Sequence, residues 1–305
     1  MNDLSAKNNR KGKLLVTGCS GFIGGNIARH AVNEGYEVVG LDRKECHIEG
    51  VKTFVGDIRN PELVNEATKG VQKIIHLAAI TSNVEFEKDP NKCYAINVDG
   101  FINILDAARL NGVKKVIYAS SAAVYTGDTG FSEGSYIDIK KQRNHYAKSK
   151  LINEMVADSY SDIYKMDIIG MRFFNVFGLG ENEKGDYASI MSIFIRENAN
   201  GRPLVIYGDG SQARDFIYVE DVAEIALLLL ERGKEPIYNV GTGTAIQYEE
   251  IANIINKSNK IYIKNPLSSY QYLTKADTKR LLDTIGKFKF TSVKNGISKI
   301  LLQTV

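Results

Sequence analysis

A tyrosine and a lysine in the stretch "RNHYAKSK" are residues whose types and spacing could carry out proton transfer. If this segment is helical, Tyr146 and Lys150 lie one turn apart on the same face. A phenol with an ordinary pKa of about 10 is a poor base at neutral pH, and a neighbouring ammonium favours its ionised form. Because most pairs with this spacing are only neighbours on a helix surface, other residues must indicate the function.

A glycine-rich stretch, "VTGCSGFIGGNIARHA", lies between an expected strand and an expected helix. Its residues Gly18, Gly21 and Gly24 permit a tight turn and let the backbone approach a pyrophosphate at the helix N-terminus. Asp42 ends the next expected strand, where a carboxylate can bind both ribose hydroxyls of an adenosine and repel a 2′-phosphate. The pattern predicts NAD as the cofactor, and Arg43 beside Asp42 leaves NADP as the alternative.

Short β-rich runs alternate with longer helical patterns as far as about residue 174. The expected strands are "KLLVT", "YEVVGLD", "KTFVGD", "KIIHLAA", "KKVIYAS" and "MDIIGMRFF", and the expected helices cover 22–34, 61–69, 90–111 and 145–164. Buried strands separated by amphipathic helices are typical of a parallel sheet covered on both faces. We therefore predict an α/β fold of the Rossmann type, with a doubly wound parallel sheet.

The pattern loosens after about residue 174, where the later strands "PLVIYG" and "PIYNV" are short. We predict an NAD-binding Rossmann domain and a smaller, interleaved C-terminal lobe that binds the substrate. The Rossmann domain is expected to cover 12–173, with 212–242 returning to it, and the substrate-binding lobe 174–211 and 243–305.

Composition and charge exclude several classes of protein. The chain of 305 residues is 44% hydrophobic and 25% charged, and its net charge of +3 is too small to indicate nucleic-acid binding. It has no apolar run of the roughly eighteen residues that cross a bilayer, and its polar N-terminus does not resemble a secretory signal. We expect a cytoplasmic protein with no membrane partner. Cys19, Cys46 and Cys93 are too widely spaced for a zinc site, and His76, in an apolar run, is expected to be a core imidazole.

Linked motifs run through about residues 13–285: "TGCSGFIG", "GDIRN", "HLAA", "INVDGFINILDAA", "ASSAAVY", "YAKSK", "RFFNVFG" and "YGDGSQARDFIYVEDV". Together they resemble the extended short-chain dehydrogenase/reductase family, and within it the NAD-dependent nucleotide-sugar epimerases and dehydratases. The resemblance implies that the cofactor is bound by the following residues: Gly18, Ser20, Gly21, Phe22, Ile23, Gly24, Asp42, Arg43, Asp57, Ile58, Leu77, Ala78, Ala79, Asn97 and Ser120.

The resemblance also implies that Ser121, Tyr146 and Lys150 are catalytic. Ser121 would hold a sugar hydroxyl against Tyr146, whose pKa Lys150 and an oxidised nicotinamide would lower. In a 4-epimerase, Tyr146 takes the C4 hydroxyl proton while a hydride passes to NAD. The 4-keto sugar then turns over, and the hydride returns to its opposite face.

The residues after Ser121 bear on which reaction is catalysed. Family 4,6-dehydratases carry an acid there to eliminate water, whereas this chain has Ala122 and Ala123. Epimerisation at C4 is therefore the favoured prediction. One alternative is an oxidoreductase or 6-epimerase acting on a nucleotide-linked sugar or heptose, because "GLGENEKGDYAS" also resembles the matching stretch of heptose 6-epimerases. The others are a 4,6-dehydratase and a non-catalytic NAD-binding sensor.

The expected substrate is a nucleotide-diphosphate sugar. The resemblance implies that Asn175 and Arg214 contact the diphosphate and that Tyr207 flanks the base; a salt bridge to Asp215 is the alternative role for Arg214. The chain departs from the family in three places: "SSYQYLTKAD" has no arginine, "RNHYAKSK" has no proline before Tyr146, and "VYTGD" has no glycine directly after "VY". The base and the sugar therefore stay open.

The expected helices 90–111 and 145–164 carry apolar residues on more than one face. In the resembling family the equivalent pair forms a four-helix bundle across a two-fold axis. We therefore predict a homodimer.

Overall fold

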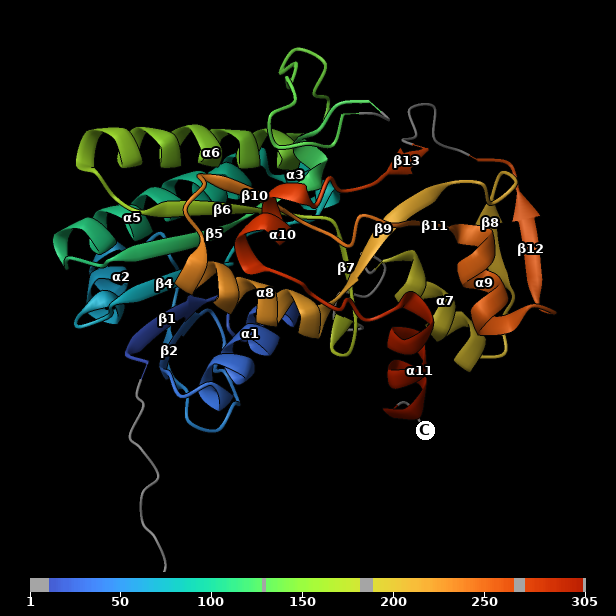
Figure 1. Cartoon of the computed structure of the whole chain (residues 1–305), viewed down its shortest axis with the longest axis horizontal. Coiled ribbons are helices and arrows are strands. Elements are labelled where there is room, and N and C mark those ends of the chain that lie inside the picture. Colours follow the sequence, from blue (N-terminus) through green and yellow to red (C-terminus); the bar gives the residue numbers. More distant parts are fainter. Residues whose placement is uncertain (1–10, 128–129, 182–188, 266–271, 304–305) are drawn as a thin grey trace, which may run out of the picture.

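The computed structural model describes residues 11–127, 130–181, 189–265 and 272–303. Within these ranges the larger sheet has seven parallel strands in the order β10-β6-β5-β4-β1-β2-β3 (Figure 1). The strands are β1 Lys13–Thr17, β2 Glu37–Asp42, β3 Lys52–Val55, β4 Lys73–His76, β5 Lys115–Ser121, β6 Ile168–Phe173 and β10 Ile237–Val240. This sheet confirms the predicted doubly wound α/β fold.

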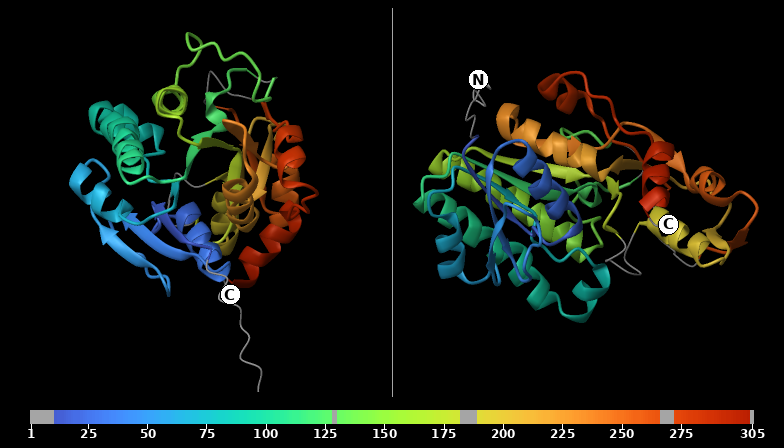
Figure 2. Two further views of the ribbon diagram at one scale, coloured as in Figure 1. Left: turned by 60° about the vertical axis from the view of Figure 1, so that its left-hand side comes forward. Right: turned by 90° about the horizontal axis from the view of Figure 1, so that it is seen from below.

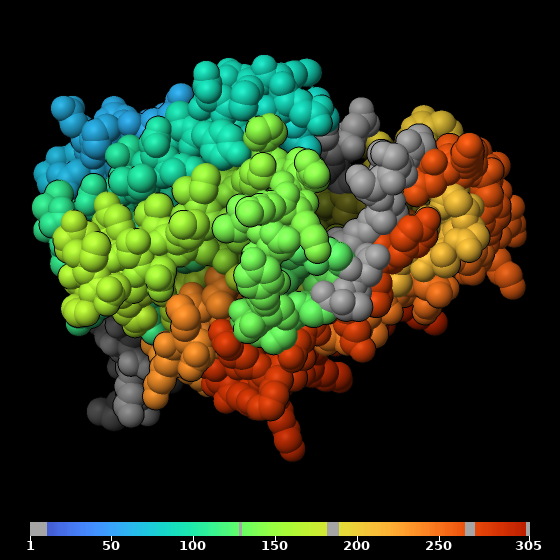
Figure 3. All heavy atoms as spheres, turned by 90° about the horizontal axis from the view of Figure 1, so that it is seen from above, coloured from blue at the N-terminus to red at the C-terminus, as the bar shows by residue number. Residues whose placement is uncertain are grey.

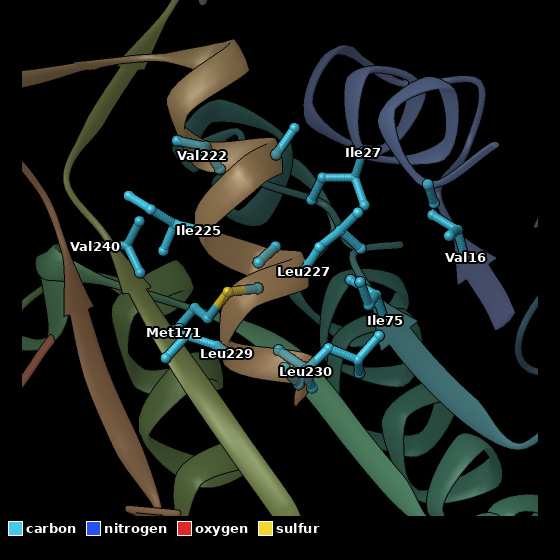
Figure 4. Packing of buried hydrophobic residues seen from close by; sticks show 14 of the residues in the cluster. Val16, Ile27, Ile75, Met171, Val222, Ile225, Leu227, Leu229, Leu230 and Val240 are labelled. Carbon is cyan, nitrogen blue, oxygen red and sulfur yellow. The ribbon is translucent and has the colours of Figure 1, made fainter. Parts of the chain in front are cut away.

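Successive strand residues point to opposite faces of the sheet, so each strand contributes to two cores. In β1, Leu14 and Val16 pack into one cluster and Leu15 into another. The first cluster is covered by α1 Phe22–Asn33, α8 Val219–Arg232 and α10 Lys279–Ile285, and the second by α2 Pro61–Thr68, α5 Gly100–Leu110 and α6 His145–Tyr164. Figure 2 shows helices on both sides of the sheet, and Figure 4 shows α8 with Ile225 and Leu229 beside Val240 and Met171.

The expected helix 90–111 is interrupted. It consists of α4 Pro90–Tyr94, a π-helical turn at Ala95–Asp99, and α5, and a short helix that was not expected, α3 Asn83–Lys88, precedes it. Asn97 lies in the π-helical turn, where its amide bonds the backbone of Ile80 instead of facing solvent. Such turns are rare and frequently occur at functional sites.

Helix α6 begins and ends where the sequence predicts, because both ends have local signals. Asn144 is its N-cap and accepts a hydrogen bond from the amide of Ala147 at 3.1 Å. Lys165, in the left-handed conformation with φ of 56°, ends the helix. The N-cap sets the start of the turn that carries Tyr146.

The smaller lobe contains a second sheet, in which β9 Ala213–Tyr218 pairs with β7 Asn175–Phe177, β11 Ala245–Gln247 and β13 Leu273–Thr274. A parallel pair, β8 Leu204–Tyr207 and β12 Lys260–Ile263, lies beside helices α7 Ile190–Ala199 and α9 Tyr248–Asn256. Helix α11 Val293–Gln303 packs on β9 and α9. The segment 212–242 is shared, since β9 belongs to this sheet whereas α8 packs on α1 and β10 pairs with β6. The domain boundaries themselves stay a prediction.

Two of the expectations from composition can be compared with this structure. In the parts of the chain that it describes, there is no helix of the length and apolar character that a membrane crossing requires. Cys19, Cys46 and Cys93, whose spacing argued against a zinc site, are buried free thiols. The first ten residues and most of "GLGENEKGDYAS" lie outside the described residues.

Candidate active site

Ser121, Tyr146 and Lys150 come together at the C-terminal end of the larger sheet. Strand β5 ends at Ser121, and the first two turns of α6 carry Tyr146 and Lys150. The Ser121 hydroxyl donates a hydrogen bond to Tyr146, and the Lys150 ammonium lies 5.8 Å from the centre of the Tyr146 ring. The structure therefore brings the three predicted catalytic residues together around Tyr146, where all three line one cavity.

These three residues line a cavity of about 300 Å³ together with the glycine-rich turn. Its other walls come from the ends of β4, β5 and β6. The cavity is lined by Gly18, Gly21, Phe22, Ile23, Gly24, Leu77, Ala79, Thr81, Ala119, Ser120, Ser121, Tyr146, Lys150, Phe173, Phe174 and Val176. In Figure 3, which views the molecule from above, the loop after β5 (green) lies beside α6 (yellow-green).

The glycine-rich turn has the shape that a dinucleotide requires. Gly18 has φ of +72°, and a Cβ there would lie 2.9 Å from the amide nitrogen of Ala78. A Cβ at Gly24 would lie 2.0 Å from the carbonyl oxygen of Gly18. Since only glycine fits at these positions, the turn leaves room for a pyrophosphate over the N-terminus of α1. The residues present therefore fit NAD.

At the adenosine end, Asp42 is held at the tip of β2. Its Oδ2 accepts a hydrogen bond of 3.0 Å from the amide of Ser20, which ties it to the glycine-rich turn. Arg43, the basis of the NADP alternative, is exposed. Asp57 is paired with Arg59 at 2.8 Å, and this guanidinium holds the pKa of Asp57 below its usual range.

Asn97 differs from the other predicted cofactor residues. It is 1% exposed, and its amide is engaged with the backbone of Ile80, at 2.7 and 2.9 Å, and with Ser149, at 3.1 Å. Ser149 in turn donates to the carbonyl of Tyr146. Asn97 therefore ties the segment after β4 at Ile80 to α6. The described lining of the cavity includes neither Asn97 nor six other predicted cofactor residues: Ser20, Asp42, Arg43, Asp57, Ile58 and Ala78.

The pKa of Tyr146 in the chain without its cofactor differs from the lowered value that the sequence predicts. Burial raises the pKa of Tyr146, and only the hydrogen bond from Ser121 lowers it. Burial also lowers the pKa of Lys150 to about 8, so this lysine still carries its charge at pH 7. The predicted depression of the Tyr146 pKa is therefore not a property of the protein alone.

His76 is the expected core imidazole. Burial, and next the charge of Lys150, lower its pKa to about 3, so it is neutral. The Thr17 hydroxyl oxygen lies 2.8 Å from His76 Nδ1 and accepts from the amides of Leu77 and Ala78. The pair fixes the backbone at two predicted cofactor residues, a role that the apolar run around His76 did not reveal.

The predicted substrate residues lie in the smaller lobe. Asn175 donates to the carbonyl of Asp215 at 3.0 Å, and buried Arg214 lies over the Tyr248 ring at 5.8 Å. The Asp215 carboxylate accepts four hydrogen bonds from other groups: the amide and hydroxyl of Thr242 and the amides of Gly243 and Ala276. Tyr207, at the end of β8, is partly exposed.

The sequence did not single out Glu154, Arg172 and Gln142. Glu154 and Arg172 form an ion pair of 2.7 Å behind Ser120, and the Gln142 amide donates to the carbonyl of Ala123 at 2.9 Å. Glu154 follows Lys150 by four residues, and Arg172 interrupts an apolar strand. Both patterns were signals that could have identified the pair.

Comparison with known proteins agrees with this geometry. A family model described as the NAD dependent epimerase/dehydratase family matches residues 14–241. A Methanocaldococcus jannaschii protein to which UDP-glucose 4-epimerase activity is provisionally assigned is 32% identical over 306 residues, covering 94% of this chain and 97% of the relative. A UDP-N-acetyl-alpha-D-glucosaminuronate decarboxylase of Bacillus cytotoxicus is 32% identical over 260 residues, covering 81% of this chain and 80% of the relative.

The solved structure of UDP-glucose 4-epimerase from Thermus thermophilus in complex with NAD is similar, with a TM-score of 0.82 at 28% identity, covering 95% of this chain and 98% of that one. A Rossmann sheet with a glycine cradle and a Ser-Tyr-Lys cluster defines a nicotinamide-dependent enzyme. More specifically, the chain belongs to the NAD dependent epimerase/dehydratase family. The resemblance inferred from its motifs is confirmed, and the cofactor is NAD.

Proposed function

We propose that this protein inverts C4 of a nucleotide-diphosphate sugar through a transient 4-keto sugar. The observation that carries the proposal is the hydrogen-bonded pair of Ser121 and Tyr146, with Lys150 beside it, in the cavity that the glycine-rich turn also lines. The names of the relatives support a nucleotide sugar as the substrate.

Each residue has a role set by its position. NAD, when bound, accepts a hydride from a sugar carbon and can return it. Tyr146 takes the proton of the C4 hydroxyl as that carbon is oxidised and gives it back as the carbon is reduced. Ser121 holds the hydroxyl against Tyr146, and the charge of Lys150 favours the phenolate. Gly18, Gly24 and Asp42 would hold the cofactor.

The finer assignments are part of the same proposal. Asn175 and Arg214 contact the diphosphate, and Tyr207 flanks the base. Exposed apolar side chains on the outer face of α6, among them Ile152, Met155 and Ile163, support a homodimer formed through α5 and α6. A cytoplasmic location stays a prediction from composition.

The test begins with the nucleotides that the purified protein retains, which mass spectrometry identifies after release. Candidate UDP-, GDP- and ADP-sugars are then incubated with the protein and followed by NMR. We expect one of them to equilibrate with its C4 epimer without accumulation of NADH. Loss of carbon dioxide from a uronate, as the decarboxylase relative's name suggests, or inversion at another carbon would contradict the proposal.

A further inference from the structure

A row of buried polar residues crosses the larger sheet next to the catalytic cluster. Ser120 on β5 is in register with Arg172 on β6, and Arg172 is in register with Asn239 on β10. In-register residues of parallel strands point to the same face. The three are between 0% and 5% exposed, so each needs polar partners inside the protein.

Helix α6 supplies the partner on one side of this row. Glu154 Oε1 accepts from the Ser120 hydroxyl at 2.5 Å and from Arg172 Nε at 2.9 Å, and Glu154 Oε2 accepts from Arg172 Nη2 at 2.7 Å. Glu154 lies on the face of α6 that carries Tyr146 and Lys150, since the three follow at intervals of four residues. The residue before Ser121 is thereby tied to the helix that holds Tyr146.

The loop after Ser121 supplies the partner on the other side. The Tyr125 hydroxyl accepts from Arg172 Nη1 at 2.9 Å and donates to Asn239 Oδ1 at 2.7 Å. The Asn239 amide then donates to the carbonyl of Phe131 at 2.7 Å. Ser121 therefore lies between two anchored residues, Ser120 and Tyr125, and both connect to the same guanidinium.

A buried ion pair is a poor source of stability, because desolvation offsets most of the attraction and an apolar pair of similar volume would serve as well. Such a pair can instead define one geometry. We propose that Glu154 is a positioning residue for the epimerisation: through Ser120 and Arg172 it fixes the Ser121 hydroxyl against Tyr146. This inference rests on the proposed function, since it assigns Ser121 and Tyr146 to the reacting hydroxyl.

The test is a double-mutant cycle on the holoenzyme with Ser120→Ala and Ser121→Ala. Ser120→Ala removes one hydrogen bond and leaves the ion pair intact. We expect kcat to fall by about tenfold while KM for the sugar nucleotide stays within about twofold. In the Ser121→Ala background, the same change should lower kcat by less than about twofold, because the hydroxyl that it positions is already absent.

Additive losses in the double mutant, or wild-type kcat in Ser120→Ala, would overturn the proposal. Glu154→Gln, which keeps the side-chain shape, is taken through the same cycle, so the test survives if Ser120→Ala does not fold. Ser159→Ala is the matched control, because the Ser159 hydroxyl on α6 bonds only the carbonyl of Met155 in the described contacts. This variant should leave kcat unchanged.

If the wild type inverts no sugar, the proposed function fails. The cycle is then run on reduction of the bound cofactor by the sugar, so the two failures are separable.

Discussion

In the proposed reaction Tyr146 acts as a base, although its surroundings in the protein alone raise its pKa. In the chain by itself, only the hydrogen bond from Ser121 opposes that effect of burial, and the positive charge of an oxidised nicotinamide would add to it when the cofactor is bound. The phenolate should therefore form mainly when the cofactor is present and oxidised, which is when a proton acceptor is needed.

Replacing Tyr146 by Phe removes the proton acceptor and keeps the ring. We expect turnover to fall by at least about a hundredfold, in line with general acid–base contributions, while NAD stays bound. Steady-state kinetics and the nucleotide content of the purified variant measure the two effects. Turnover near the wild-type rate would remove Tyr146 from the mechanism.

The pKa of Lys150 makes a separate prediction about stability. Burial lowers it from 10.5 to about 8 in the folded, cofactor-free chain. Between these two pH values the Lys150 side chain binds more protons in the unfolded chain than in the folded one. The contribution of Lys150 to the free energy of unfolding therefore rises with pH. Relative to Lys150→Met, the free energy of unfolding of the cofactor-free wild type should rise by about 3 kcal/mol between about pH 7 and about pH 11. Urea denaturation at several pH values measures it, and parallel curves for the two proteins would refute it.

At the scale of elements, the ion pair between α6 and β6 should matter more than its surface counterparts. The Glu154 and Arg172 side chains are 15% and 6% exposed. Because Glu154→Ala would leave a buried guanidinium without its carboxylate, we expect it to lower the free energy of unfolding by roughly 3 kcal/mol.

Asp283→Ala provides the matched control in urea denaturation. It breaks an ion pair of 2.6 Å between Asp283 and Lys279, and the side chains of these two residues are 64% and 79% exposed, respectively. Such exposed pairs contribute up to about 1 kcal/mol. Similar losses of free energy of unfolding in Glu154→Ala and Asp283→Ala would show that the buried ion pair does not stabilise the packing of α6 on β6.

Elements with strong local signals could be predicted from the sequence. The extent of α6 follows from its periodicity and its cap at Asn144, and the glycine-rich turn from the spacing of its glycines. The π-helical turn around Asn97 could not be predicted, because a single inserted residue leaves the helical pattern nearly unchanged. The row from Ser120 to Asn239 depends on strand register between distant segments, which no local pattern encodes.

At the scale of the whole molecule, the proposed homodimer can be tested on the exposed apolar side chains of α6. Met155 is 62% exposed and Ile163 68% exposed on this face. We expect the protein to sediment near twice the chain mass of 33.8 kDa at micromolar concentration. Met155→Glu should shift it toward the monomer, because a dimer would bury the new charge.

Leu302→Glu is the control for this prediction. Leu302 is 80% exposed on α11, far from α5 and α6 (Figure 1). The variant should sediment as the wild type does. A monomeric wild-type protein, or equal dissociation in both variants, would refute a dimer built on α6.

The proposed reaction oxidises and re-reduces C4 of a nucleotide sugar, and NMR of the reaction in deuterated water tests this chemistry. Because this chemistry exchanges no carbon-bound hydrogen with water, the product should be inverted at C4 and carry no deuterium on any sugar carbon. A dehydratase has to remove the C5 proton, so it would give a 4-keto-6-deoxy product or deuterium from the solvent. Either of those results would contradict the assignment as a 4-epimerase.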